Sequence, residues 1–145
     1  GYVSKGDDIE QLTAAIRKET MKTKILIVDD HQMYREGLKA VLARQADMDV
    51  VGEAENGLDA VAKARELQPD VILMDVNMPV MDGAEATSRI LAEQPGMKIL
   101  ALSVQAEDGY MSSMLRAGAM GYVLKGSDSD ELYGIIRRTA GSRNA

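Results

Sequence analysis

The sequence predicts an α/β domain with a five-stranded parallel sheet covered by helices on both faces. Short apolar runs and amphipathic stretches alternate five times along about 120 residues, which is typical of that architecture. The apolar runs are continuous rather than alternating, as expected for strands that are buried on both faces. A length of 145 residues fits one domain of ordinary size.

The first strand, helix and second strand follow Met21. Residues 24–28 are mainly apolar and β-branched, and this run stops at two aspartates, as a buried strand does. Residues 31–46 carry apolar side chains at helical spacing, Met33 among them, which predicts an amphipathic helix. A second strand is expected over residues 50–54, because a turn pair, Asn-Gly, follows it.

The middle of the chain repeats this pattern. The spacing of apolar residues from Leu58 to Leu67 predicts a second helix, which Pro69 ends. Residues 71–74 form a third apolar run that leads directly into Asp75. After a turn that contains Pro and Gly, a third helix is expected through residues 90 and 91, and it stops near the next Pro-Gly pair.

The last third supplies two more strands and two more helices. The fourth strand is expected at residues 98–104, and Met111 and Met114 line the helix that follows, with Gly118 as its C-terminal cap. The fifth strand is expected at residues 121–125. Asp128 or Ser127 caps the last helix.

Composition excludes several classes of protein. With 17 basic and 23 acidic side chains the net charge is −6, which disfavours direct binding to nucleic acid or an anionic membrane. The absence of Cys and the single His exclude a disulfide scaffold and a multi-histidine zinc site. No apolar run approaches the roughly 18–20 residues of a membrane helix, and no export signal is evident. We expect a cytoplasmic protein.

Acidic side chains gather at the expected ends of two strands. Asp29 and Asp30 follow the first strand, and Asp75 follows the third, which can lie beside the first at a topological switch point. Three carboxylates so close together repel one another and need compensation. A hard cation such as Mg²⁺ provides it.

Two further strand ends carry groups that suit phosphoryl transfer. Asp75 is placed to act as a nucleophilic carboxylate, Ser103 offers a hydroxyl and Lys125 offers a mobile positive charge. Taken singly, each has an ordinary explanation, since a lone strand-end Asp is more often a helix cap. The combination at neighbouring strand ends favours a phosphoryl site. His31 is expected in the first turn of a helix, and we assign it no chemistry.

At these residues the sequence resembles the receiver domain of bacterial two-component response regulators. The resemblance extends from Met21 to Ala140, and residues 51–57 resemble the subclass whose output is a LuxR-type helix-turn-helix DNA-binding domain. The segments that carry the resemblance are 25–31, 70–79 with Asp82-Gly83, 102–103 and 121–126.

The resemblance implies a flavodoxin-like fold with the strand order 2-1-3-4-5. It also implies that Asp75 is the phosphorylated aspartate. Asp29, Asp30 and Asp75 would hold Mg²⁺, and Asn77 would add a backbone carbonyl ligand.

The resemblance further implies how the signal is passed on. Ser103 and Lys125 would contact the phosphoryl group, and Tyr122 would be the aromatic switch residue. The donor would be a histidine kinase or a small acyl phosphate, and the surface formed by the fourth helix, the fifth strand and the last helix would change. The domain would not be an enzyme, because the phosphoryl group is hydrolysed from its own residue. The output domain that binds DNA is not in this chain, and residues 141–145 are interpreted as a linker.

The first 20 residues repeat the last strand and helix. Gly1–Thr20 matches Gly121–Ala140 at an offset of 120 with nine identities in 20, where chance gives about one or two. The segment is a remnant of an upstream receiver or an arbitrary boundary, or else a natural or engineered duplication. Two such units cannot fill one sheet edge together, so the first copy displaces the second, within one chain or in a neighbouring chain, or lies idle. We predict a dimer formed by exchange of these units, with Lys5 standing in for Lys125.

Other function classes remain as alternatives. One is an interaction module that keeps the fold and signals without phosphorylation, although the intact strand-end residues argue against it. A flavin- or nucleotide-binding enzyme would need a phosphate-binding loop after the first strand, where this chain has Asp29-Asp30. A haloacid-type phosphotransferase would want a second acid where this chain has Asn77.

Overall fold

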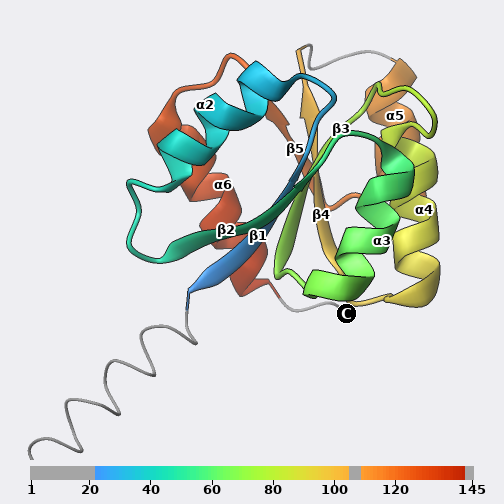
Figure 1. Ribbon diagram of the computed structural model, residues 1–145, viewed down its shortest axis with the longest axis horizontal. Helices are drawn as coiled ribbons and strands as arrows, with labels where there is room; N and C mark the ends of the chain where they lie inside the picture. Colours follow the sequence, from blue (N-terminus) through green and yellow to red (C-terminus); the bar gives the residue numbers. More distant parts are fainter. Residues whose placement is uncertain (1–21, 105–108, 143–145) are drawn as a thin grey trace, which may run out of the picture.

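A computed structural model describes residues 22–104 and 109–142 of the chain. Within these residues five parallel strands form one sheet in the order β2-β1-β3-β4-β5 (Figure 1). The predicted fold class and strand order are therefore confirmed. The strands are β1 (Thr23–Val28), β2 (Met48–Ala54), β3 (Val71–Asp75), β4 (Lys98–Ser103) and β5 (Gly121–Leu124).

Five helices in the described residues cover the two faces of the sheet (Figure 1). They are α2 (Gln32–Leu42), α3 (Gly57–Leu67), α4 (Gly83–Glu93), α5 (Gly109–Ala117) and α6 (Ser129–Gly141). Helices α2 and α6 pack on one face, and α3, α4 and α5 pack on the other. Among the described helices, none combines the length and apolar character needed to cross a membrane.

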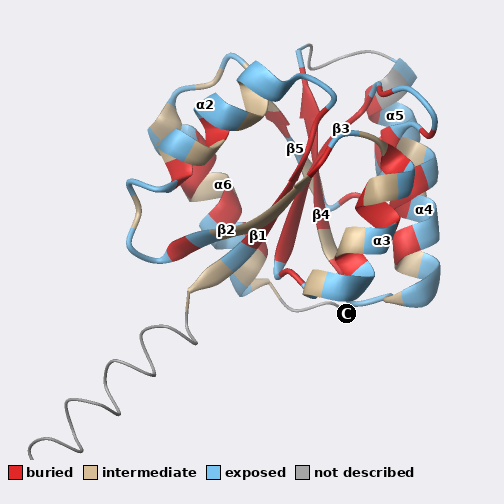
Figure 2. Cartoon of the chain, in the orientation of Figure 1, coloured by how far each residue is buried: buried red, intermediate tan, exposed pale blue. Residues whose placement is uncertain are grey.

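The core lies on both sides of the three central strands. Every residue of β3 is buried, β1 is buried after its first two residues and β4 after its first, so these strands form the red centre of Figure 2. The edge strands β2 and β5 are only partly buried. The continuous apolar runs of the sequence therefore correspond to the central strands, as the physics of doubly covered sheets requires.

Short polar side chains fix where three helices begin. The side chains of Asn56, Asp82 and Asp128 accept hydrogen bonds from the backbone amides three residues later, at 2.8, 2.9 and 2.8 Å. These N-caps satisfy amides that have no partner within the helix. Of the two caps proposed for the last helix, Asp128 is the one observed. Gly118 has a φ of +117° at the end of α5, a conformation that suits glycine.

The first helix differs from its sequence prediction in length and in one side chain. It ends at Leu42 rather than Ala46, because the amides of Arg44 and Gln45 bond to carbonyls three residues back and tighten the chain into a turn. Met33 is 85% exposed. It lies in the first turn of α2, where apolar spacing alone does not reveal whether a partner covers the side chain.

Tyr133 ties α6 to α2 and supports a stability prediction. Its hydroxyl donates a 2.6 Å hydrogen bond to the carbonyl of Val41, and the side chain is buried. We expect Tyr133→Phe to lower the free energy of unfolding by about 1 kcal/mol, because the hydrogen bond from the hydroxyl of the buried Tyr133 to the partly buried carbonyl is lost. Urea denaturation would measure the change. The matched control is Tyr122→Phe, whose exposed ring should give a change within about 0.5 kcal/mol. Equal losses of unfolding free energy for Tyr133→Phe and Tyr122→Phe would contradict a stabilising role of the Tyr133–Val41 hydrogen bond.

Candidate functional site

Strand register brings the predicted site residues to one edge of the sheet. Val28 pairs with Met74, so the next residues, Asp29 and Asp75, lie side by side at the ends of β1 and β3. Ser103 is the last residue of β4 and pairs with Leu124. The residue after Leu124 is Lys125, which therefore lies at the same edge.

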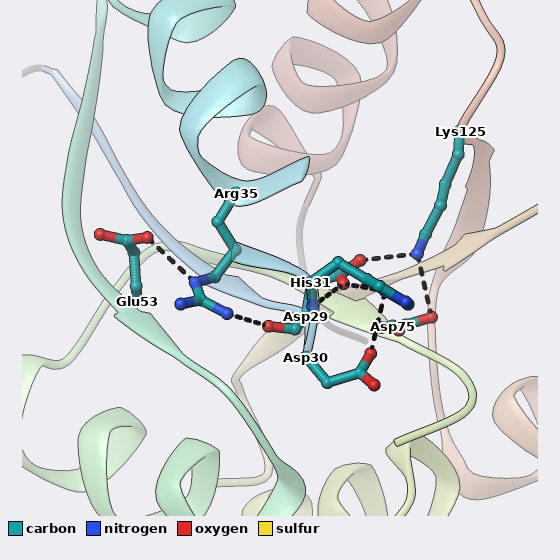
Figure 3. A network of polar contacts seen from close by, with 7 residues as sticks. All are labelled: Asp29, Asp30, His31, Arg35, Glu53, Asp75 and Lys125. Atoms are coloured by element: carbon teal, nitrogen blue, oxygen red, sulfur yellow. Dashed lines mark hydrogen bonds and ion pairs between the residues drawn. The ribbon is translucent and has the colours of Figure 1, made fainter. Parts of the chain in front are cut away.

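A partly buried lysine, Lys125, links two of the acids (Figure 3). The ammonium nitrogen of Lys125 lies 2.6 Å from Oδ2 of Asp29 and 3.4 Å from Oδ1 of Asp75. The Asp29 side chain is fully buried, and the side chains of Asp75 and Lys125 are 6% and 15% exposed. Two carboxylates thus share one cation in a region with little water, where charge interactions are stronger than at the surface.

The acidic environment shifts the titration of Asp75. Burial first, and then the charge of Asp29, raise the pKa of Asp75 to about 6. The charge of Lys125 and a hydrogen bond from the backbone amide of Asn77 act in the opposite direction. Asp75 is thus a partly desolvated carboxylate that any added positive charge will favour in its ionised form.

Four ligand atoms at this edge are close enough to surround one cation. Asp29, Asp30, His31 and Asp75 each offer one atom, and these atoms all lie within 4.8 Å of one another. The three carboxylates are hard oxygen donors and suit Mg²⁺, whereas imidazole is not a ligand that Mg²⁺ prefers. The donor set therefore fits the predicted ion.

His31 is the residue before α2 rather than part of its first turn, and its side chain contacts both acids that precede it. Its Nδ1 atom is 3.1 Å from Oδ1 of Asp29 and 3.2 Å from Oδ1 of Asp30, and its backbone amide donates to Asp29 at 2.8 Å. The imidazole is 69% exposed. These contacts place His31 at the solvent side of the acidic cluster, where it orients carboxylates without enclosing them.

Two residues of the site were not identified from the sequence. Arg35 donates to the backbone carbonyl of Asp29 at 2.6 Å and pairs with Glu53 at 3.1 Å (Figure 3). The ring of Tyr34 lies 4.7 Å from the ammonium of Lys125, in a cation–π contact. Burial and the charges of Asp29 and Asp75 raise the pKa of Tyr34 to about 12. The only signal in the sequence for Tyr34 and Arg35 was their position near the start of the helix that follows Asp29 and Asp30.

The remaining predicted residues occupy less central positions. Ser103 is buried at the end of β4, Asn77 is exposed just beyond β3, and Tyr122 is 42% exposed on the edge strand β5. The roles expected for the Ser103 hydroxyl, the Asn77 carbonyl and the Tyr122 ring stay predictions. Lys5 lies outside the described residues.

A parallel sheet in the order β2-β1-β3-β4-β5, with acids and a lysine at the carboxyl ends of its strands, is the arrangement of a receiver domain. Comparison with known proteins agrees with the geometry. The chain belongs to the response regulator receiver domain family, whose model matches residues 25–137.

Several curated relatives are named as regulators. The chain is 42% identical over 119 residues to the transcriptional regulatory protein DegU of Brevibacillus brevis, covering 82% of this chain and 50% of the relative. It is 44% identical over 121 residues to the response regulator GacA of Pseudomonas aeruginosa, covering 83% and 56%. The chain thus spans about half the length of the curated relatives it matches.

Solved structures give the same family. A LuxR-family response regulator from Aurantimonas sp. superposes with a TM-score of 0.77 at 35% identity, covering 84% of this chain and 88% of that one. The receiver domain of the sensor histidine kinase PA1611 from Pseudomonas aeruginosa, solved with magnesium in its active-site cleft, has a TM-score of 0.77 at 32% identity, covering 83% and 99%. The chain is therefore a receiver domain of the two-component type.

Proposed function

We propose that Asp75 accepts a phosphoryl group from a histidine kinase. The observation that carries this proposal is the buried Asp75 carboxylate at a strand end, beside Asp29 and within reach of Lys125. Carboxylates act as nucleophiles toward phosphorus when their charge is held in position and the charge of the phosphoryl oxygens is neutralised. The receiver region proposed for this chemistry is 21–140.

Mg²⁺ fits this site and would be held by Asp29, Asp30 and Asp75, together with the backbone carbonyl of Asn77. When bound, the ion supplies positive charge to the phosphoryl oxygens. Asp29 and Asp75 are buried and Asp30 is partly exposed, and these three carboxylates would hold the ion. The magnesium-bound solved relative supports this assignment.

The chain's own residues would then complete the transfer. A carboxylate oxygen of Asp75 forms the new bond to phosphorus in line with the breaking bond to the kinase's histidine nitrogen. Lys125 leaves its shared position between Asp29 and Asp75 and pairs with a phosphoryl oxygen. Ser103 donates its hydroxyl to another phosphoryl oxygen. Because the phosphoryl group is later hydrolysed from Asp75 itself, we do not class the chain as an enzyme.

Phosphorylation would be communicated to partners through the surface formed by α5, β5 and α6. Drawing Ser103 and Lys125 toward the phosphoryl group would favour an alternative arrangement of that surface, with Tyr122 changing its rotamer. The exposed ring of Tyr122 on β5 supports this role, because a partly exposed side chain can turn inward without first leaving the core.

We further propose the wider setting of the chain. It would act in a cytoplasmic two-component system, receive phosphate from a histidine kinase and form a homodimer. DNA would be bound only through an output domain outside this chain, as the names of DegU and the LuxR-family relative support.

Intact mass spectrometry tests the phosphoryl acceptor. With Mg²⁺ and a small acyl phosphate, we expect a single phosphoryl adduct on the wild-type chain and none on Asp75→Asn, because the amide is a poor nucleophile. The matched control is Asp49→Asn, an exposed acid on β2 that should leave the adduct unchanged. Folded wild-type protein without an adduct would instead support the interaction module that signals without phosphorylation.

A further inference from the structure

The turn that carries two of the predicted metal ligands is held from outside the site. Asp29, Asp30 and His31 connect the end of β1 to the start of α2. The backbone amide of Asp29 donates to the carbonyl of Ala54 on β2 at 3.0 Å. The carbonyl of Asp29 accepts a hydrogen bond at 2.6 Å from Nη1 of Arg35, near the start of α2. Both backbone polar groups of Asp29 are therefore fixed by neighbouring elements.

The carbonyl of Asp29 belongs to the peptide bond that joins the two acids. A peptide bond is planar, so the orientation of this carbonyl sets the direction in which the chain enters Asp30. The side chain of Asp30 is partly exposed, whereas that of Asp29 is fully buried. Packing therefore holds Asp30 less firmly than Asp29, and the placement of Asp30 depends more on the backbone that Arg35 holds.

Arg35 is itself held at its other end (Figure 3). Its Nε atom donates to Oε1 of Glu53 on β2 at 3.1 Å, and the Arg35 side chain is only 13% exposed. Lys39, one turn further along α2, pairs with Oε2 of Glu53 at 2.8 Å. Hydrogen bonds from Lys39 and from Arg35 hold the pKa of Glu53 below its usual range, so Glu53 remains an ionised acceptor. The guanidinium thus bridges two fixed acceptors, which an exposed and flexible ion pair does not do.

An ordinary ion pair between α2 and β2 explains only one of these two contacts. Lys39 pairs with Glu53, and no described contact joins Lys39 to the turn at residues 29–31. Arg35 pairs with the same Glu53 and makes a second contact, to the carbonyl between two predicted metal ligands. Groups that hold metal ligands in place commonly govern the affinity for the metal.

We propose that Arg35 is a positioning residue of the metal site, which holds the peptide plane between Asp29 and Asp30 so that both carboxylates are ready to bind the ion. This inference rests on the proposed function, because it concerns the affinity of that site for Mg²⁺. No described contact joins Arg35 to Asp75 or Lys125. Its contribution is therefore to the binding of the ion and not to the transfer of the phosphoryl group.

Charge and position predict opposite effects of removing Arg35. The guanidinium is a positive charge that is bonded to the carbonyl of Asp29. By charge alone, its removal would strengthen the attraction of the acidic site for Mg²⁺. If Arg35 positions the acids, its removal weakens binding, because the ion must then also order the turn that carries them. The sign of the change in affinity decides between the two explanations.

A titration with Mg²⁺ alone, followed by the backbone amide resonances of the isotope-labelled full chain, measures this sign. We expect Arg35→Met to raise the Kd for Mg²⁺ about tenfold, at the lower end of the effects of groups that hold metal ligands. Lys39→Met is the matched control, because it removes a positive charge from the same Glu53 without touching the turn, and it should not raise the Kd. Arg35→Lys keeps the charge but loses the planar fork, so it should still raise the Kd.

The Mg²⁺ dependence of adduct formation gives a second readout. With a small acyl phosphate, Arg35→Met should need about ten times more Mg²⁺ for half of its maximal rate and should reach the wild-type rate at saturation. A role in the transfer itself would lower the maximal rate instead. Urea denaturation in a chelator checks that each variant is folded before Mg²⁺ is added. Should Arg35→Met fail that check, Arg35→Lys carries the test.

Two outcomes in folded variants would overturn the inference alone. An unchanged or lower Kd in Arg35→Met would show that Arg35 does not position the ligands. An equal rise of the Kd in Lys39→Met would show that the ion pair with Glu53 matters, and not the contact with Asp29. A wild-type chain that neither responds to Mg²⁺ nor forms an adduct would instead overturn the proposed function, and this inference with it.

Discussion

Replacing Lys125 by Met will lower the free energy of unfolding of the metal-free protein by about 3 kcal/mol at neutral pH. The ammonium of Lys125 is the cation shared by the buried carboxylates of Asp29 and Asp75. Without it, one carboxylate must remain ionised and unpaired or take up a proton, and both alternatives are costly. Urea denaturation in the presence of a chelator would measure the loss. The proteins with and without Lys125→Met should both carry Lys5→Met, so that Lys5, which the repeat predicts to stand in for Lys125, cannot compensate.

A second lysine separates this charge effect from the loss of an ordinary hydrogen bond. Lys98 donates to the carbonyl of Ala140 and pairs with no carboxylate in the described contacts, so Lys98→Met should cost only about 1 kcal/mol. Adding Asp75→Asn to Lys125→Met should recover much of the larger loss, because it removes one of the two repelling carboxylates. Mg²⁺ should also reduce the loss of unfolding free energy caused by Lys125→Met, because the ion supplies positive charge to the same carboxylates. Equal losses for Lys98→Met and Lys125→Met would contradict the shared-cation interpretation.

The sequence predicted the strand ends well because burial of the central strands is a local pattern. Residues 71–74 are continuously apolar, and Asp75 is the first charged residue after them, so its place at the carboxyl edge followed directly. Lys125 and Ser103 followed from the same rule. Parallel register then brings these residues together without any further information from the sequence.

The parts that were missed depend on contacts between distant segments. Arg35 on α2 reaches Glu53 on β2, and the ring of Tyr34 on α2 meets Lys125 just after β5. Leu58 follows helical spacing and is nevertheless 54% exposed, because the period of a helix does not say how far a neighbouring element covers it. Such contacts arise from tertiary packing, which a single sequence does not record.

Replacing Gly83 by Ala will destabilise the fold by at least about 2 kcal/mol and displace the proposed phosphoacceptor. An added Cβ at Gly83 would overlap the backbone carbonyl of Asp75, and it would also lie 3.1 Å from Sδ of Met114. A flexible side chain can move aside, but the backbone at the end of β3 cannot move without shifting Asp75. We therefore expect Gly83→Ala to lower both the urea midpoint and the rate of adduct formation with a small acyl phosphate.

Gly37 provides the matched control for this argument. It lies inside α2, and an added Cβ there would meet nothing within 4 Å. Gly37→Ala should therefore raise the free energy of unfolding by about 0.5–1 kcal/mol, because alanine loses less backbone entropy in a helix. The two substitutions add the same methyl group to two helices, and opposite signs would follow from the close approach to Asp75, which Gly83 makes and Gly37 does not. A stabilising Gly83→Ala would show that this approach does not constrain the site.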